Sequence, residues 1–343
     1  MNIVTRKTRG FPAVPALFAL LAVQALAAPA PLHAGPQREA PSGAAAPAAP
    51  AYPAAINVSY VESPFNLQIM VMRERRMLEE AFAAKGVEVR WHEINSGADQ
   101  TQAMAAGSLD IGSVINSTSI ILANAAGNRV EIAALVSRPR QTFALMVRDG
   151  GPRSIAELRG RTVAGPKGTV LHQMLVAALV REGLGPEDLN FIQMGLPEAR
   201  AALLSGQIDG ALQAASLIIR DQEAGARILF TADGYLTPLL FTAVRPGFAA
   251  SWPDLLQLYL DTQEAAFDWI AAHRDEAVAI GSRYQQISPE DGAKLFEWSG
   301  IARVMENDDL PALRADVDFL YDQEMIEVRV RPEDFIRPSA YGR

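Results

Sequence analysis

The sequence predicts a two-lobed α/β fold with a helical C-terminal part, and three observations support this class. From Ile56 onward, short β-branched runs alternate with longer amphipathic patterns, as in sheets that are covered by helices. One local unit occurs twice, at 101–113 and at 199–211: an Ala-rich helix, a Gly, an apolar residue, an Asp and a strand. From Ser251 the chain is almost entirely helical. This part cannot complete a sheet of its own, so we expect it to pack on the first lobe.

The first lobe is expected to begin at Ile56 and to alternate strands with helices. Glycines at 86, 107 and 127 follow three helical patterns, where a residue that tolerates a left-handed backbone ends a helix. The expected strands are 56–61, 87–94, 109–115 and 130–136, and the expected helices are 66–84, 98–106 and 119–126. Such an alternation is typical of a parallel sheet.

The second lobe is expected to repeat this alternation. Pro197 stands at the first position of one helical pattern and Gly206 lies just past its end, as is common at helix boundaries. The expected strands are 142–147, 162–164, 189–194 and 208–212, with helices at 170–182 and 197–205. An extended return at 239–244 then leads to helices at 255–284, 289–298 and 310–323.

If the helical tail packs on the first lobe, the chain crosses between the lobes twice. The crossings are expected near 143–149 and 241–245. They define lobe I as 56–143 plus 244–343 and lobe II as 144–243. Paired crossovers form a hinge, and a hinge between two α/β lobes encloses a cleft. The cleft is therefore the expected ligand site.

The N-terminus has the features of a secretory signal peptide, expected at 1–27. Basic residues at 6, 7 and 9 precede an uncharged apolar stretch at 11–28, and Ala25-Leu26-Ala27 offers the small-x-small cleavage pattern. The alternative is an uncleaved membrane anchor, although prolines at 12 and 15 interrupt the stretch. Residues 28–55 contain 12 Ala and 7 Pro, which predicts a flexible or polyproline-like linker.

Composition excludes several classes of function. The 343 residues carry a formal net charge of -8, so no positive field favours nucleic acid or an anionic membrane. The absence of Cys removes disulfides, thiolate metal sites and Cys nucleophiles, and the four His are not spaced as metal ligands. The sequence also lacks the nucleophile-elbow, P-loop and dinucleotide motifs. We therefore expect no enzyme, no cofactor and no metal.

Small polar residues follow the predicted strands of lobe I, just before helices begin. In open α/β sheets the carboxyl ends of strands line the ligand crevice, where free N–H groups and helix dipoles attract anions. A small anionic organic ligand is therefore expected. The alternative is ordinary helix capping, which favours the same residue types. The lobe I candidates for ligand binding are Ser63, Phe65, Asn66, Ser96, Asn116, Ser117 and Thr118.

Lobe II offers a second set of candidates for ligand binding: Thr142, Lys167, Thr169, His172 and Gln213. Lys is scarce in this chain, yet Lys167 falls in the loop expected to face the cleft. His172 follows three residues after Thr169 and could point a ring nitrogen at an oxyanion. Arg138 and Arg140, before the first crossing, are further candidate cations. For the charged residues, simple solvation is the alternative.

Four segments resemble the aliphatic sulfonate, nitrate and taurine group of periplasmic substrate-binding proteins. They are YVESPFNLQIM at 60–70, AAGSLDIGSVINSTSIILANAAG at 105–127, VAGPKGTVLHQMLVAALVREGLGPEDL at 163–189 and EARAALLSGQIDGAL at 198–212. The resemblance implies a type II periplasmic-binding-protein fold. It also implies a periplasmic protein that closes on a sulfonate-like ligand and delivers it to an ABC permease. A monomer is expected.

The chain departs from this group at two places. After Pro-Lys-Gly, the sulfonate members tend to have Ser-Ser-Ala-His, whereas this chain has Thr169, Val170, Leu171 and His172. Past the second Asp motif many members have an aromatic residue, where this chain reads through Leu212 to Gln213. A thiamine-precursor-binding protein and an enzyme of the same fold, acting on a pyrimidine or aromatic acid with His172 or a cleft carboxylate as general base, therefore stay open. So does a sensor for a membrane receptor.

Overall fold

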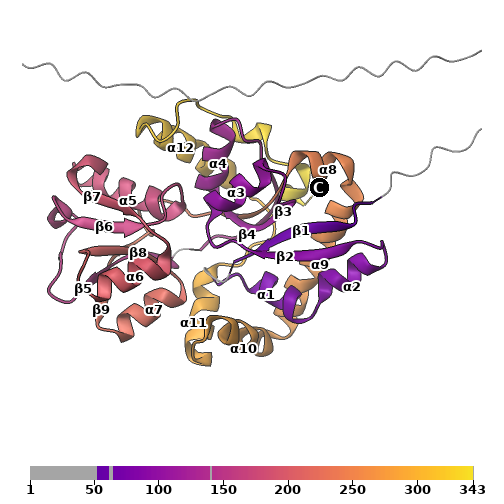
Figure 1. The fold of residues 1–343 in the computed structure, drawn as a ribbon, viewed down its shortest axis with the longest axis horizontal. Helices are drawn as coiled ribbons and strands as arrows, with labels where there is room; N and C mark the ends of the chain where they lie inside the picture. The colour runs from indigo at the N-terminus through magenta and orange to yellow at the C-terminus, as the bar shows by residue number, and fades with distance from the viewer. Residues whose placement is uncertain (1–51, 62–64, 140, 343) are drawn as a thin grey trace, which may run out of the picture. The chain divides into compact units, whose positions relative to one another are not determined.

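The computed structural model describes residues 52–61, 65–139 and 141–342 (Figure 1). Pro50–Arg343 form one compact unit. The expected signal peptide at 1–27 and most of the linker at 28–55 lie outside the described residues. Within the described part of the chain, no helix is long and apolar enough to cross a membrane.

The sheet of lobe I has the order β2-β1-β3-β10-β4. Its strands are β1 (Ala55–Tyr60), β2 (Glu88–Glu93), β3 (Ile111–Asn116), β4 (Glu131–Ser137) and β10 (Leu240–Val244). β1 runs parallel to β2 and β3, whereas β10 runs antiparallel to β3 and β4. The four strands expected in this lobe, β1 to β4, therefore run in one direction as expected, and β10, which enters from the other lobe, runs in the opposite direction.

Four helices follow the early strands of lobe I: α1 (Leu67–Glu74), α2 (Met77–Ala83), α3 (Gly97–Ala105) and α4 (Ser117–Ala125). The single helix expected at 66–84 is broken, since Arg76 has a left-handed backbone with φ of 53°. Most of α1 is buried, including Leu67, Met70 and Met72, and it packs against the C-terminal helices α9 (Pro253–Ala272) and α10 (Arg274–Gln285).

The sheet of lobe II has the order β7-β6-β8-β5-β9. Its elements are β5 (Phe143–Arg148), β6 (Thr162–Gly165), β7 (Asn190–Gln193), β8 (Gly210–Ala214), β9 (Ala226–Thr231), α5 (Val170–Arg181), α6 (Leu196–Leu204) and α7 (Ser216–Glu223). β5 is antiparallel to β8 and β9. The strand expected at 208–212 lies two residues later, and β9 was not expected, because its pattern shows no clear alternation.

The C-terminal part is helical, as expected, and packs on lobe I (Figure 1). The remaining helices are α8 (Pro246–Ser251), α11 (Pro289–Ser299) and α12 (Asp309–Asp322), with short 3-10 turns at Ala156–Leu158, Pro186–Asp188, Pro332–Asp334 and Pro338–Tyr341. The helix expected at 255–284 is two helices, α9 and α10, separated by His273 with φ of -130°. α12 packs against α4, so the tail also covers the other face of lobe I.

The chain passes from one sheet to the other between β4, which ends at Ser137, and β5, and it returns between β9 and β10. Phe143 belongs to the lobe II sheet and Leu240 to the lobe I sheet. Both crossings therefore precede the expected limits at 143/144 and 243/244, because each crossing segment directly precedes a strand of the sheet it enters. The outer limits of the lobes stay predictions.

The internal repeat corresponds to one structural device used in both lobes. Asp110 precedes β3, and its Oδ2 accepts a hydrogen bond from the backbone N–H of Asn57 at 2.9 Å. Asp209 precedes β8, and its Oδ2 accepts from the backbone N–H of Thr162, also at 2.9 Å. The N–H of each Asp donates in turn to the carbonyl of the same neighbour. Each Asp thereby ties the start of its own strand to the adjacent parallel strand.

Candidate functional site

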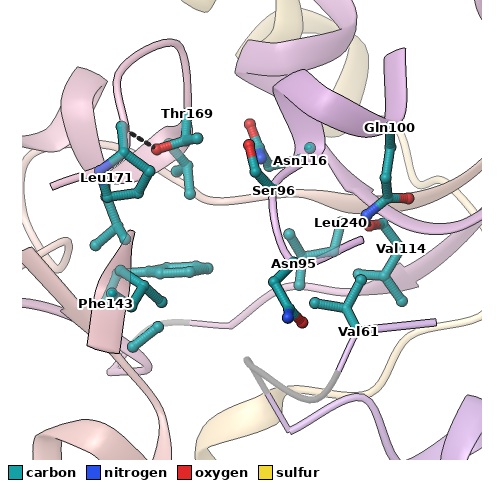
Figure 2. A pocket seen from close by; sticks show the side chains of 15 residues that line it. Val61, Asn95, Ser96, Gln100, Val114, Asn116, Phe143, Thr169, Leu171 and Leu240 are labelled. Carbon is teal, nitrogen blue, oxygen red and sulfur yellow. Dashed lines mark hydrogen bonds between the residues drawn. The ribbon is translucent and has the colours of Figure 1, made fainter. Parts of the chain in front are cut away.

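A cavity of about 50 Å³ lies between the two sheets (Figure 2). Both lobes contribute to it. The described residues that line it are Val61, Asn95, Ser96, Gly97, Gln100, Val114, Asn116 and Leu240 from lobe I, with Phe143, Pro166, Thr169, Val170, Leu171, Leu196 and Ala214 from lobe II. One water needs roughly 10–15 Å³ of such volume, so the cavity has room for about four groups the size of a water molecule.

Two helix N-termini reach the cavity from lobe I, and each is capped by its own side chain. Ser96 caps α3 by accepting the Asp99 N–H at 3.4 Å, and Asn116 caps α4 by accepting the Ser119 N–H at 2.9 Å. The Nδ2 of Asn116 has no hydrogen-bond partner among the described residues. This amide is therefore a donor available to a ligand.

Gly97 brings the N-termini of α3 and α4 close together. A Cβ at this position would lie 2.7 Å from Asn116 Nδ2 and 2.8 Å from Ser119 Oγ, closer than real Cβ contacts. The missing side chain therefore lets the N-termini of both helices approach the same space. The first N–H of α4, from Ser117, is used by the Leu239 carbonyl at 3.0 Å, so α4 offers the Asn116 amide there instead.

The N-terminus of α5 reaches the cavity from lobe II and has no side-chain cap. Thr169 occupies the capping position, but its hydroxyl donates to the Pro166 carbonyl at 2.8 Å instead of accepting from the helix (Figure 2). The N–H groups of Val170 and Leu171 have no acceptor among the described residues. Gly168, with φ of +72°, supplies the left-handed backbone that this turn requires.

The arrangement suits an anion. Three helix N-termini from two lobes converge on one cavity, and their N–H groups and dipoles stabilise negative charge. None of the described lining residues is charged. A bound anion would therefore be held by neutral donors, with no lining guanidinium or ammonium group to neutralise it.

A larger outer groove, of about 590 Å³, continues from the cavity along the boundary between the lobes. The two hollows share Asn95 and Ser96 from lobe I and Pro166 and Leu196 from lobe II. Farther out the groove has charged lining residues: Asp99, Glu198, Arg200 and Arg220. A ligand with a small head in the cavity could extend its tail into this groove.

Three of the predicted site residues line the cavity: Ser96, Asn116 and Thr169. Ser117 and Thr118 do not, although they begin α4. They lie in a hydrogen-bonded cluster with Gln173 of α5 and Asp316 of α12. Burial raises the pKa of Asp316 to about 6, while hydrogen bonds from Gln173 and Ser117 act against that rise. At neutral pH Asp316 is therefore mostly a carboxylate that only accepts hydrogen bonds.

Phe65 and Asn66 are buried in lobe I rather than exposed to the cleft. The Phe65 ring packs so close to Gly281 of α10 that a Cβ there would overlap it. Asn66 precedes α1, and its Nδ2 donates to the Val61 carbonyl at 3.4 Å. The expectation that Phe65 forms a cleft wall is wrong, because its ring is buried against α10. Ser63 lies outside the described residues.

Thr142 and Gln213 are fully buried next to lining residues without lining the cavity themselves. Gln213 was expected in a loop, but it lies within β8, where its Nε2 donates to the Leu196 carbonyl at 3.0 Å. Among the described residues, Thr142 Oγ1 and Gln213 Oε1 have no hydrogen-bond partner. Both side chains support the wall that Phe143 and Ala214 present to the cavity.

Lys167 and His172 do not line the cavity. Lys167 is exposed, and its backbone N–H donates to Gln193 Oε1 at 2.5 Å. The His172 ring is buried, with its centroid 4.9 Å from that of Phe191. Burial, with a smaller contribution from Lys167, lowers the pKa of His172 to about 4. The expectation that His172 faces a bound oxyanion is wrong, because this turn of α5 packs the ring into lobe II.

Arg138 is not a cleft cation either. Its guanidinium forms two hydrogen bonds to Asp309 at the start of α12, with distances of 2.9 and 2.5 Å. Arg140 lies outside the described residues.

Sequence reasoning missed the apolar part of the cavity, above all Val61, Val114, Phe143, Leu196 and Leu240. These residues have the same types and alternation as the core, so nothing in the sequence separates them from it. Among the described residues, no group of three or more His, Asp or Glu side chains could hold a metal ion.

Comparison with known proteins places these features in a family. A family model described as NMT1/THI5 like matches residues 81–277. A putative aliphatic sulfonates-binding protein of Bacillus subtilis (strain 168) is 27% identical over 274 residues, which cover 78% of this chain and 82% of that protein. Its name describes a binding protein and not an enzyme.

Two solved structures show the fold. The alkanesulfonate-binding protein SsuA from Xanthomonas axonopodis pv. citri, bound to MOPS, has a TM-score of 0.74 at 20% identity, covering 83% of this chain and 98% of that one. The desulfurization enzyme DszB has a TM-score of 0.61 at 16% identity, covering 83% and 96%. The expected periplasmic-binding-protein fold is confirmed. Because the family model matches more than half of the sequence, this chain belongs to the NMT1/THI5-like family.

Proposed function

We propose that this protein is the substrate-binding component of an ABC importer and that it captures a small sulfonate-like anion between its lobes. One observation carries the proposal: the N-termini of α3, α4 and α5 converge from both lobes on one cavity without charged lining residues. The names of similar proteins, which bind aliphatic sulfonates, support the same ligand class.

The donors favour a fully ionised acid over a phosphate-like one. The available groups are backbone N–H donors of α3 and α5 and the Asn116 amide, and no carboxylate is among the described lining residues. A sulfonate accepts at all three oxygens, whereas a singly protonated phosphonate also needs an acceptor for its own O–H. The cavity should therefore bind a sulfonate more tightly than a phosphonate, because no carboxylate among its described lining residues can accept the phosphonate O–H.

The rest of the ligand is expected to be apolar near its head. Val170 stands where relatives tend to have a second hydroxyl, and its side chain is buried on the cavity wall with Leu171 and Leu196. Leu212 lies in the core of lobe II against Gly165, so it does not shape the cavity. An alkyl chain leaving through the mouth between Ser96 and Pro166 enters the outer groove.

Binding without bond chemistry is what the described geometry supports best. An enzyme of this fold needs a base or nucleophile at the ligand, and the candidate base was His172 or a cleft carboxylate. No carboxylate is among the described residues that line the cavity. The His172 ring is buried against Phe191, and a pKa of about 4 leaves little basicity. We further propose that the protein is secreted by a cleaved signal peptide and acts as a monomer. It would deliver its ligand to a permease in the inner membrane.

Calorimetry and thermal shift test this function on the purified protein with ethanesulfonate, butanesulfonate, taurine, nitrate, ethanephosphonate and benzoate. We expect the alkanesulfonates to bind and to raise the melting temperature by mass action. Mass spectrometry of the recovered ligand should return it unchanged. Binding of benzoate alone would overturn the proposed ligand class, and conversion of the ligand would favour the enzyme.

A further inference from the structure

Beside the cavity, four polar side chains from both lobes form one hydrogen-bonded cluster, which we call the Asp316 cluster. It consists of Ser117 and Thr118 of α4, Gln173 of α5 and Asp316 of α12. Ser117 Oγ donates to Asp316 Oδ2 at 3.1 Å, and Gln173 Nε2 donates to Asp316 Oδ1 at 2.7 Å. Thr118 Oγ1 donates to Gln173 Oε1.

Every bond in the cluster has a fixed direction. A carboxylate only accepts, so the carboxylate of Asp316 requires the NH₂ end of Gln173 and the hydroxyl proton of Ser117. The amide oxygen of Gln173 is then left facing Thr118, whose hydroxyl donates to it. A change of polarity at Gln173 or Asp316 therefore breaks the cluster even if its shape is kept.

The cluster lies directly behind two of the helix N-termini that meet at the cavity. Thr118 is two residues after Asn116, and Gln173 is one helical turn after Thr169, whose carbonyl accepts its N–H at 3.0 Å. A further bond between the lobes runs from Ser119 Oγ to the Gly168 carbonyl at 2.9 Å. The spacing of α4 and α5, and so of the Asn116 amide and the first N–H groups of α5, depends on these contacts.

We propose that Gln173 and Asp316 are positioning residues that latch the two lobes at the spacing at which the anion is held. The proposal rests on the proposed function for its ligand, but the latch itself is a property of the chain. Because Gln173 belongs to lobe II and Asp316 packs on lobe I, breaking their bond should loosen the boundary at this cluster. The bond from Ser119 to Gly168 and the bonds from α7 to Gln285 of α10 remain.

The test reverses the polarity of the bond. Gln173→Glu places two carboxylates together and should weaken butanesulfonate binding by about 10- to 100-fold, chiefly through a faster off-rate. Asp316→Asn should weaken it less, because the amides can rearrange. In the double variant, the carboxylate introduced on α5 would accept from both Thr118 and the amide introduced on α12, whose oxygen still accepts from Ser117. The double variant should therefore regain affinity to within a few-fold of wild type.

Gln102→Glu is the matched control, since it adds the same charge on the exposed surface of α3. It should bind like wild type. Gln173→Glu should also lower the ligand-free melting temperature, because it buries a second carboxylate beside Asp316, and the double variant should restore it. A merely structural role would lower the melting temperature and leave affinity alone. Unchanged affinity in Gln173→Glu, or a double variant no better than the weaker single one, would overturn the latch.

Small-angle scattering separates this proposal from the proposed function. If wild type binds no sulfonate, the proposed ligand class fails, but the radius of gyration still reports the lobe spacing. We expect a larger value for Gln173→Glu than for wild type or the double variant. An unchanged radius in Gln173→Glu would overturn the latch whatever the ligand is.

Discussion

The two lobes differ in how the first N–H groups of their helices are satisfied at the cavity. In lobe I, Ser96 and Asn116 cap α3 and α4 with their own side chains. In lobe II, the Thr169 hydroxyl turns away to Pro166, which leaves the first N–H groups of α5 without a side-chain acceptor. In lobe I the caps accept from the helices and leave the Asn116 amide as a donor, whereas in lobe II the first N–H groups of α5 have no acceptor among the described residues. This difference indicates that the anion completes α5 as the lobes come together.

The largest expected effect comes from changing the lobe I cap without removing it. Asn116→Asp keeps the oxygen that accepts the Ser119 N–H, so the stability of α4 should be retained. It replaces the Nδ2 donor by negative charge at the cavity, which should weaken sulfonate binding by more than about 100-fold, or roughly 3 kcal/mol. Calorimetry measures the loss, and the ligand-free melting temperature is the control. Retained affinity would show that the anion does not approach α4.

A second change removes one donor from the uncapped helix of lobe II. Val170 is the first residue of α5, where Pro is tolerated, and Thr169 already has the extended backbone that a residue before Pro needs, with φ of -124° and ψ of 169°. Val170→Pro deletes one N–H group and should weaken sulfonate binding by about 10- to 100-fold. Val170→Ala keeps the N–H group and serves as control. Equal affinities of the two variants would contradict the role given to α5.

The third prediction concerns how lobe II responds to acid. Burial, with Lys167 second, lowers the pKa of His172 to about 4 from an ordinary value of 6.5. The neutral ring contributes stability above pH 6.5, which is lost as the pH falls toward 4, because the unfolded chain takes up the proton first. The loss should reach about 2 kcal/mol near pH 4.5.

Urea unfolding at pH 7 and 4.5 measures this loss, and His172→Gln should remove it. Burial raises the pKa values of Asp316 and Asp221 to about 6, so these groups favour the folded state as the pH falls. The difference between wild type and His172→Gln cancels their contribution. If both proteins lose the same stability on acidification, the buried neutral ring is not the cause.

The smallest expected effect lies at the turns that follow β3 and β8. Asn116 precedes α4 with an ordinary extended backbone, whereas Ala215 precedes α7 with φ of 48° and ψ of -119°. Side chains with a Cβ rarely adopt this conformation, while Gly does so readily. Ala215→Gly should stabilise the protein by about 1 kcal/mol in urea unfolding, with relief of strain exceeding the entropy that Gly adds to the unfolded chain. A destabilised variant would mean that the Ala215 methyl group contributes more by packing.

The sequence predicted residues that line the cavity where a polar side chain stands between a strand and the helix that follows it. Ser96, Asn116 and Thr169 follow strands in the polar pattern that predicts helix starts, and all three line the cavity. The inward turn of His172 could not be read in advance, because a polar residue in the first helical turn faces solvent, ligand or core according to how the helix packs. The break at Arg76 was equally hidden, since the apolar periodicity continues through it.

The helix α12 has a mechanical consequence for the protein. Near its start, Asp309 holds Arg138 at the first crossing, and two turns later Asp316 holds Gln173 of the opposite lobe. Seven residues at 1.5 Å each put these points about 10 Å apart along one rod. A rotation of one lobe about the first crossing would therefore tilt α12, and with it the Asp316 carboxylate that binds Gln173 of the other lobe. The C-terminal helix α12 therefore connects the first crossing between the lobes to the contact between α4 and α5 beside the cavity.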